Sequence, residues 1–247
     1  MAHIDRHGPQ SSAFLFKLTQ DTHRCKDSSL RRLQALTDAE YLIRPKQQEQ
    51  IAKANFNAHV YDLSAKGYEY LTYHHMLERH ARPTGHWWHG FWVASVSSAI
   101  EINAARSGLE YIPAAQILAL NDVGMAIPLE RGTLIPDQLF ALKYPDGYRV
   151  FALEVDRGTE PVRSQAARKS LQRSVRQYAE VLHHRLHQQH FRLKSGLLVV
   201  SVFMSHARER QFLDLLGAER GHHLTAVCAP GFPNWETVLP ALQKIFV

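Results

Sequence analysis

The stretch Pro136-Asp-Gln-Leu-Phe-Ala-Leu-Lys-Tyr-Pro-Asp-Gly-Tyr-Arg-Val-Phe-Ala-Leu-Glu-Val-Asp156 decides the fold that we expect for this chain. At its middle lies Tyr144-Pro-Asp-Gly147, which is a turn sequence because proline presets φ and glycine accepts a positive φ. Apolar runs on both sides of such a turn predict a β-hairpin. Folding the two strands back about this turn places Asp137 opposite about residue 155.

Three carboxylates therefore meet at one end of the predicted hairpin, those of Asp137, Glu154 and Asp156. Side chains alternate between the faces of a strand, so Glu154 and Asp156 share one face. Like charges this close destabilise a fold unless a cation or a raised pKa relieves them. Because Mg²⁺ takes oxygen ligands of this kind, the cluster predicts a metal site. The alternative is that each acid is only the polar exit from a strand into a loop.

The arrangement resembles the metal-dependent PD-(D/E)xK nuclease fold, in which a Pro-Asp and a Glu-x-Lys on neighbouring strands hold the metal. Pro136-Asp137 and Glu154-Val-Asp156 match this pattern, except that Asp156 stands at the lysine position. The longer string Phe151-Ala-Leu-Glu-Val-Asp-Arg-Gly-Thr-Glu-Pro161 is similar to plasmid replication-relaxation proteins and to MOB-C plasmid mobilisation relaxases.

That resemblance implies an α/β (α+β) protein with two domains. Residues 1–82 would form an N-terminal winged helix-turn-helix that binds DNA, and residues 86–247 a PD-(D/E)xK restriction-endonuclease-like domain with a mixed central sheet. The implied activity is a site- and strand-specific DNA nickase that hydrolyses a phosphodiester with Mg²⁺ or Mn²⁺ at a plasmid transfer origin. Its partners would be the duplex and nicked origin DNA, accessory mobilisation proteins and a coupling protein.

The resemblance also assigns roles to individual side chains. Asp137, Glu154 and Asp156 would bind the metal, with Glu101 as a fourth ligand, since nucleases of this fold often carry an acid on the helix before the sheet. Lys169 is a substitute for the missing lysine and joins the three strand-end acids in the catalytic set. We expect it on the outer face of a helix, however, which argues against that role. Two arginines offer further positive charge and would contact DNA, Arg157 directly after the acids and Arg168 nearer the edge of that helix. None of the three cations is assigned as the base.

Positive charge is concentrated in one part of the chain. The formal net charge is +6 and the pI is near 9.4, which favours a nucleic-acid partner. Residues 161–194 hold eight Arg or Lys against one acid, a local charge of 8 − 1 = +7. Within them the apolar spacing Leu171, Val175, Tyr178, Leu182 and Leu186 predicts an amphipathic helix. Its opposite face would carry cations that contact phosphate, namely Lys169, Arg173 and Arg176.

The first eighty residues suit a small DNA-binding module. Ser28 or Ser29 would cap a helix that runs to residue 42 and offers Arg31, Arg32 and Gln34 to a DNA groove. Residues 43–48, which include Lys46, and residues 59–63 would be the two strands of a wing, closed by residues 64–71. Winged helices also dock proteins, so protein binding is the alternative use of this module.

The rest of the chain alternates between helical and strand patterns, as in an α/β domain. Two breakers mark a joint at residues 82–85. Four further elements are predicted: a buried helix at 86–105, a first strand at 116–120, a central strand at 196–203 and a strand at 224–228. Helices are also expected at residues 207–218 and 235–246.

Other features exclude some classes of protein. No apolar run reaches the length of a membrane span, and the first residues have no apolar signal-peptide core, so we expect a cytoplasmic protein. Cys25 and Cys228 give neither a disulfide framework nor metal-ligand spacing. The group His183, His184, His187 and His190 has a spacing that can chelate a transition metal, but no carboxylate or cysteine completes it, which favours a surface role.

Two alternatives to a metal-dependent nickase remain open. The Glu-x-Asp departure would also suit a regulator of plasmid replication whose nuclease-like domain is inactive. A nuclease with little sequence preference would degrade DNA to short fragments. Most other relaxases use a tyrosine nucleophile, and Tyr144, Tyr148 and Tyr178 lie near the predicted elements, but no His-x-His-type metal triad accompanies them.

Overall fold

The computed structural model describes residues 1–48, 58–77, 86–164, 169–217 and 223–229. The chain divides into two compact units, Met1–Ile102 and Asn103–Val247. The division falls after most of the helix that begins at Trp87, and not near residue 83, where the sequence places a joint. That joint at residues 82–85 and the closing helix expected at 235–246 lie outside the described residues.

The first unit combines short helices with a small antiparallel sheet of order β1-β3-β2. Its elements in chain order are α1 (Ala2–His7), β1 (Gln10–Ser11), α2 (Ser12–Leu18), α3 (Lys26–Asp38), β2 (Leu42–Ile43), the 3₁₀ helix η1 (Lys46–Gln48), β3 (Val60–Leu63), α4 (Ala65–Tyr73) and most of α5 (Trp87–Arg106). The helices expected near residues 29–42 and 86–105 are thus present. The first runs from residue 26 to 38, and Cys25 is its N-cap, not Ser28 or Ser29.

Two strands of this unit pair as the sequence analysis expects. β2 and β3 are antiparallel, with Leu42 opposite Leu63. The first of them is only two residues long, and the chain turns into η1 where we expect the strand to continue through Lys46. Ser64 then caps α4, because its hydroxyl accepts a hydrogen bond from the Gly67 amide at 2.9 Å. A cluster of buried side chains holds these elements together: Ile4, Leu15, Leu33, Leu42, Tyr61, Leu63 and Leu71.

The second unit is built on a mixed sheet of five strands, order β10-β9-β8-β7-β4. The strands are β4 (Glu110–Pro113), β7 (Gln138–Tyr144), β8 (Gly147–Asp156), β9 (Leu197–Phe203) and β10 (Leu224–Cys228); β5 (Ile127–Pro128) and β6 (Thr133–Leu134) form a separate pair. β8, β9 and β10 are parallel, while β4, β7 and β8 are antiparallel. The mixed α/β fold that we expect is therefore confirmed at this level, and the strand at 196–203 is central as predicted.

One predicted strand is wrong. Residues 116–119 belong to α6 (Ala114–Ala119), Leu120 is the C-cap of this helix, and the first strand of the sheet is β4, just before it. A short apolar run such as Ile117-Leu-Ala-Leu120 cannot be told from a buried helix by its periodicity. Ile117 and Leu118 are buried in the same cluster as Leu139 of β7, so the run packs on the sheet as a helix.

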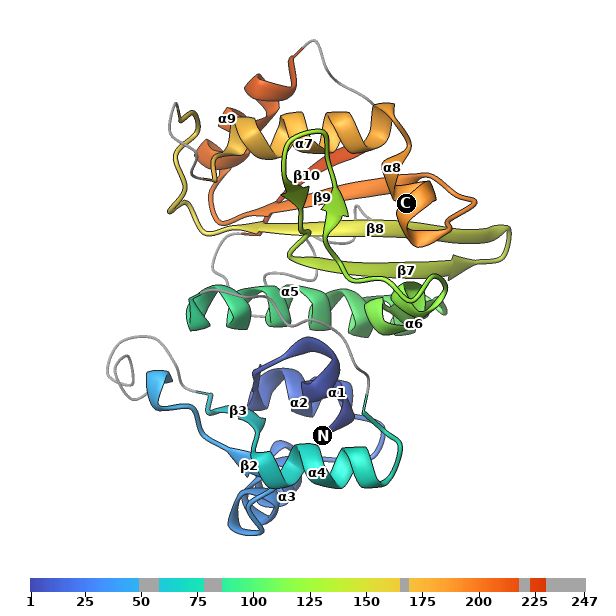
Figure 1. Cartoon of the computed structure of the whole chain (residues 1–247). Coiled ribbons are helices and arrows are strands. Elements are labelled where there is room, and N and C mark those ends of the chain that lie inside the picture. The colour runs from blue at the N-terminus through green and yellow to red at the C-terminus, as the bar shows by residue number, and fades with distance from the viewer. Residues whose placement is uncertain (49–57, 78–85, 165–168, 218–222, 230–247) are drawn as a thin grey trace. The chain divides into compact units, whose positions relative to one another are not determined.

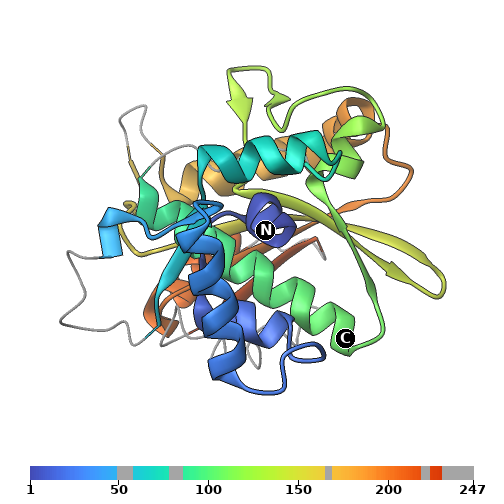
Figure 2. The ribbon, with the colours of Figure 1, turned by 90° about the horizontal axis from the view of Figure 1, so that it is seen from below.

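The hairpin forms as predicted, but the pairing of its strands is shifted by one residue from the register that we expect. Its two-residue loop joins Tyr144 to Gly147, which are paired, and Gln138 pairs with Leu153. Continuing this register brings Asp137 opposite Glu154, not residue 155. The turn of the hairpin extends beyond the rest of the sheet (Figures 1 and 2).

The amphipathic helix predicted after the hairpin is α7 (Leu171–His183), which covers one face of the sheet together with α9 (His206–Leu216) (Figure 1). Its predicted stripe is buried at Leu171, Val175 and Tyr178. The helix ends at His183, however, because Arg185 adopts a positive φ of 53°, and α8 (Leu186–Phe191) begins after it. His183 therefore shares no helix face with His187 and His190, which contact the backbone carbonyls of Val181 and Gly124.

In the described part of the chain, none of the helices combines the length and the apolar character that crossing a membrane requires.

A close backbone approach makes Gly67 a sensitive position. A Cβ at residue 67 would lie 2.3 Å from the carbonyl oxygen of Tyr41, a backbone atom that cannot rotate away. We expect Gly67→Ala to lower the free energy of unfolding by about 1–3 kcal/mol, as overpacking does. The matched control is Gly90→Ala in α5, where a Cβ meets nothing within 4 Å and should stabilise the helix by about 0.5–1 kcal/mol. Urea denaturation of both variants checks this, and equal stabilities would contradict it.

Candidate functional site

Two acidic side chains meet where the β7–β8 hairpin enters the sheet. Asp137 directly precedes β7, and its Oδ2 accepts a hydrogen bond from the amide of Val155 at 2.8 Å. Glu154 lies on β8, and continuing the hairpin register by one residue places it opposite Asp137. The two carboxylates are buried, with only 9% and 11% of their side chains exposed. The hairpin register thus places two buried acids beside each other.

The amine of Lys169 lies among these acids. Its Nζ is 3.2 Å from Oε2 of Glu154, 3.7 Å from Oδ1 of Asp137 and 3.6 Å from Oε1 of Glu160. We expected Lys169 on the outer face of the helix, and this is wrong because α7 begins only after it, with Ser170 as the N-cap. Lys169 is thus not bound by the periodicity of the helix, and its side chain points towards the strand ends. About half of the Lys169 side chain remains exposed to solvent.

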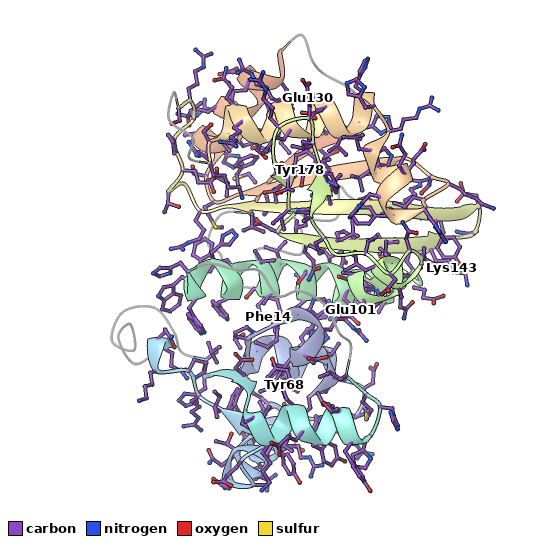
Figure 3. All side chains as sticks on the ribbon, in the orientation of Figure 1. Phe14, Tyr68, Glu101, Glu130, Lys143 and Tyr178 are labelled. Carbon is purple, nitrogen blue, oxygen red and sulfur yellow. The ribbon has the colours of Figure 1, made fainter. Side chains whose placement is uncertain are left out.

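The second oxygen of Glu154 is held by a tyrosine. The hydroxyl of Tyr178 donates to Oε1 of Glu154 at 2.6 Å, and the ring lies between α7 and the sheet (Figure 3). Burial, followed by the charge of Glu154, raises the pKa of Tyr178 well above its ordinary value, so the hydroxyl stays protonated. The other two tyrosines singled out in the sequence lie at the turn end of the hairpin. Tyr144 is paired with Gly147 next to the turn, and Tyr148 is the second residue of β8. Tyr178 orients Glu154 and has no exposed oxygen to act as a nucleophile.

Burial and charge set the protonation of this group. Burial, together with the charge of Asp137, raises the pKa of Glu154 to about 7, against the lowering effect of Lys169 and Tyr178. Burial would lower the pKa of Lys169, but the charges of Glu154, Asp137 and Glu160 outweigh it and raise that pKa above its ordinary value. Lys169 is therefore an ammonium at neutral pH, which can stabilise negative charge but cannot accept a proton.

Asp156 belongs to a different contact from the one that we expect. The guanidinium of Arg208, in α9, donates to it through Nε at 3.2 Å to each oxygen and through Nη2 at 3.0 Å to Oδ2. The same Nη2 donates to the carbonyl oxygen of Glu160, and the amide of Gly158 donates to Oδ1 of Asp156. Asp156 thus fixes the chain after β8 to α9, and its oxygens are used in doing so.

Glu101 is also engaged elsewhere. Its carboxylate is bound within the first unit by side chains of α1, namely His3, Arg6 and His7. For this reason Glu101 is left out of the Mg²⁺ or Mn²⁺ site that we propose for Asp137 and Glu154.

The predicted DNA-contacting cations have different surroundings. Arg31 and Arg32 on α3 and Lys46 on η1 are exposed. Arg173 and Arg176 are exposed on the face of α7 opposite its buried stripe, as the periodicity predicts, and Arg157 is half-buried. Arg168 lies outside the described residues.

Asp137 and Glu154 suit a divalent cation that keeps part of its water shell. In the part of the chain that the structure describes, no third His, Cys, Asp or Glu is close enough to complete a three-ligand set with them. Mg²⁺ is commonly bound by one or two carboxylates, with water and substrate phosphate in the other positions. The donor set therefore fits Mg²⁺ or Mn²⁺ better than a metal that needs a full protein cage.

Sequence reasoning missed two residues of this site. Glu160 lies within the string that carries the family resemblance, and its position between Asp156 and Lys169 was the available signal. Arg208 gave no signal, because 52 residues separate it from Asp156 and only the packing of α9 joins them.

Comparison with known proteins gives one match. A family model described as replication-relaxation matches residues 1–194, which include Asp137, Glu154, Glu160, Lys169 and Tyr178 but not Arg208. No curated protein and no solved structure matches the chain.

The protonation of Glu154 yields a direct prediction for the metal-free protein. We expect its carboxyl group to titrate near pH 7 in a carbon-detected NMR experiment. Lys169→Met removes a positive neighbour and should raise this pKa, whereas Asp137→Asn removes a negative one and should lower it. Lys143→Met, at the exposed far end of the hairpin (Figure 3), is the control and should change nothing. Shifts of the opposite sign would contradict the arrangement.

The Asp156–Arg208 pair yields a prediction about stability. Their side chains are 7% and 11% exposed, so Arg208→Ala leaves a buried carboxylate without its cation. We expect the free energy of unfolding to fall by about 3 kcal/mol, whereas Arg210→Ala on the exposed side of α9 should change it by less than about 0.5 kcal/mol. Denaturant titration of the two variants measures the difference, and similar values for both would show that the pair has no such role.

Proposed function

Because the chain belongs to the replication-relaxation family, we propose that it nicks one strand of plasmid DNA at a specific site. The family itself indicates a role in plasmid replication or relaxation. The finer proposal is a metal-dependent endonuclease of the PD-(D/E)xK kind, a relaxase that acts at a transfer origin. The observation that carries it is the position of the Lys169 amine between the carboxylates of Glu154 and Asp137.

This position supplies the charge that the sequence motif lacks. In the PD-(D/E)xK pattern the lysine follows the glutamate on the same strand, where this chain has Asp156. Here that aspartate is paired with Arg208, and the amine comes from the segment before α7. Two acids and one lysine are thus together although the motif is broken, which supports an active nuclease over an inactive regulator.

Each side chain has a distinct part in the proposed hydrolysis. When bound, a divalent cation neutralises the scissile phosphate and lowers the pKa of a water. Asp137 and Glu154 are the ligands that would hold it. Lys169, kept as an ammonium by Glu154, Asp137 and Glu160, stabilises the negative charge that grows on the phosphate in the transition state. Tyr178 keeps Glu154 in one orientation through its hydrogen bond.

DNA binding would come from exposed cations on both units. We propose that α3 with the β2–β3 pair is a winged-helix module, in which Arg31, Arg32 and Lys46 meet the duplex. Arg173 and Arg176 line the outer face of α7, and α7 begins next to Lys169. Phosphates held by this face would therefore lie on the element that adjoins the site, while accessory mobilisation and coupling proteins would act on the nicked complex.

Nicking of supercoiled plasmid tests the proposal. With DNA from the neighbourhood of the protein's own gene and Mg²⁺ or Mn²⁺, we expect open circles, and none with EDTA. Asp137→Asn and Glu154→Gln should abolish nicking, and Lys169→Met should slow it by about 100-fold, with partial recovery in Lys169→Arg. Lys143→Met, which keeps an exposed position far along the hairpin, should nick normally.

Binding and cleavage must be measured separately. A gel shift with the same DNA should be unchanged in Asp137→Asn, because that variant alters the site and not the exposed cations. Cleavage that persists in Asp137→Asn would contradict the site, and sequence-specific binding by a wild-type protein that never nicks would favour the regulator instead.

A further inference from the structure

A second cluster of potential metal ligands lies in the first unit, apart from the residues used above. His3 and His7 are one helical turn apart on α1, and Glu101 lies on the side of α5 that faces them (Figure 3). Their ligand atoms all lie within 4.8 Å of one another. His3 and His7 are buried, at 8% and 1% exposure. Histidines at i and i+4 on one helix face have the spacing that chelates a transition metal.

Both imidazole rings point a nitrogen at the same carboxylate oxygen. Nδ1 of His3 is 3.2 Å from Oε2 of Glu101, and Nε2 of His7 also contacts that oxygen. The other oxygen, Oε1, is bound by Arg6. Oε1 of Glu101 is thus bound by the guanidinium of Arg6, and Oε2 lies next to one ring nitrogen of each histidine.

The far nitrogens of the two rings are held by serine hydroxyls. Nε2 of His3 is 2.7 Å from Oγ of Ser98, and Nδ1 of His7 is 2.8 Å from Oγ of Ser97. Metal-binding histidines are commonly oriented in this way, by a hydrogen bond to the nitrogen that does not bind the metal. The two serines are themselves fully buried on α5, so the rings are fixed on both sides.

The hydroxyl of Ser97 joins His7 to the backbone of α5. Its Oγ is 2.8 Å from Nδ1 of His7 and 3.2 Å from the carbonyl oxygen of Ala94. When this hydroxyl donates to the carbonyl oxygen, it accepts from Nδ1–H of His7, and Nε2 then carries the lone pair that a metal would take.

We propose that His3, His7 and Glu101 form a metal centre that binds Zn²⁺ and fastens α1 to α5. Two imidazole nitrogens and one carboxylate oxygen are a ligand set of Zn²⁺ and of neighbouring transition ions, whereas Mg²⁺ prefers oxygen alone. Water would take the remaining position.

A structural purpose follows from the helix itself. α1 has six residues, which is too short for an isolated helix to persist in water. A centre that joins residues 3 and 7 to residue 101 would tie it to α5, the longest of the described helices, across more than ninety residues of sequence. The proposed centre is therefore a fastening between two helices, and the chemistry of Asp137 and Glu154 does not depend on it.

Metal analysis of the purified full chain tests the proposal. After dialysis against Zn²⁺ and then against metal-free buffer, we expect about one Zn²⁺ per wild-type chain and none in His7→Gln or Glu101→Gln. Co²⁺ in place of Zn²⁺ should give visible d–d absorption in the wild type only. Ser97→Ala should weaken Zn²⁺ binding by about 10- to 100-fold, because it removes the partner that orients His7.

Three control variants separate this centre from other possibilities. His23→Gln removes a half-buried histidine of the same unit and should leave the Zn²⁺ content unchanged. His206→Gln disrupts the second described group of possible ligands, His206, Glu209 and Cys228, and Asp137→Asn disrupts the proposed nuclease site; both should also keep Zn²⁺. Loss of Zn²⁺ in either, with retention in His7→Gln, would overturn the proposal, as would a wild-type chain that binds none.

A last variant tests the site even if His7→Gln fails to fold. His3→Cys keeps a metal-binding side chain, so the Co²⁺ protein should show a thiolate-to-cobalt charge-transfer band that the wild type lacks. A folded His3→Cys protein with Co²⁺ bound and no such band would show that residue 3 is not a ligand.

Discussion

The two-residue turn between Tyr144 and Gly147 is the constraint on which the site depends. It sets the register in which Gln138 pairs with Leu153, and this register alone brings Asp137 beside Glu154. A slip of one residue would send the acids of β8 to the opposite face of the sheet, away from α7 and its tyrosine. Leu139, Ala141, Val150 and Ala152 are buried in one cluster, so the same register is required by the core. Packing and chemistry thus select one pairing.

Charge balance follows from that register. Two buried carboxylates side by side would be unfavourable without compensation, and the raised pKa of Glu154, the ammonium of Lys169 and the hydroxyl of Tyr178 each relieve part of the repulsion. Asp156, two residues on, is compensated separately by Arg208. The two acids that share a face of β8 therefore have different roles. Asp156 is held in an ion pair with Arg208, whereas Glu154 lies beside the half-exposed Lys169. We propose that the metal and the phosphate approach Glu154, because the lysine beside it is half exposed.

Much of the second unit could be predicted from the sequence, and the reasons are local. The hairpin has a strong turn signal, β9 is a continuous apolar run, and α7 has a clear stripe that includes Tyr178. The strand expected at residues 116–120 failed because a short apolar run has no decisive period. The position of Lys169 could not be predicted, since it depends on where α7 begins. The contact of Arg208 depends on how α9 packs. His3 and His7 have the spacing of metal ligands on a helix, but Glu101 is more than ninety residues away in the sequence, so their meeting depends on tertiary packing.

The central claim is that Asp137 and Glu154, with Lys169 beside them, hold a divalent cation. Crystals of the full chain soaked in Mn²⁺ and measured at the manganese absorption edge test it most directly. We expect an anomalous peak about 2.1 Å from one oxygen of each carboxylate, with the Lys169 amine near the ion but not bound to it. A well-ordered site without such a peak, or manganese bound by Asp156 with Arg208 displaced, would contradict it.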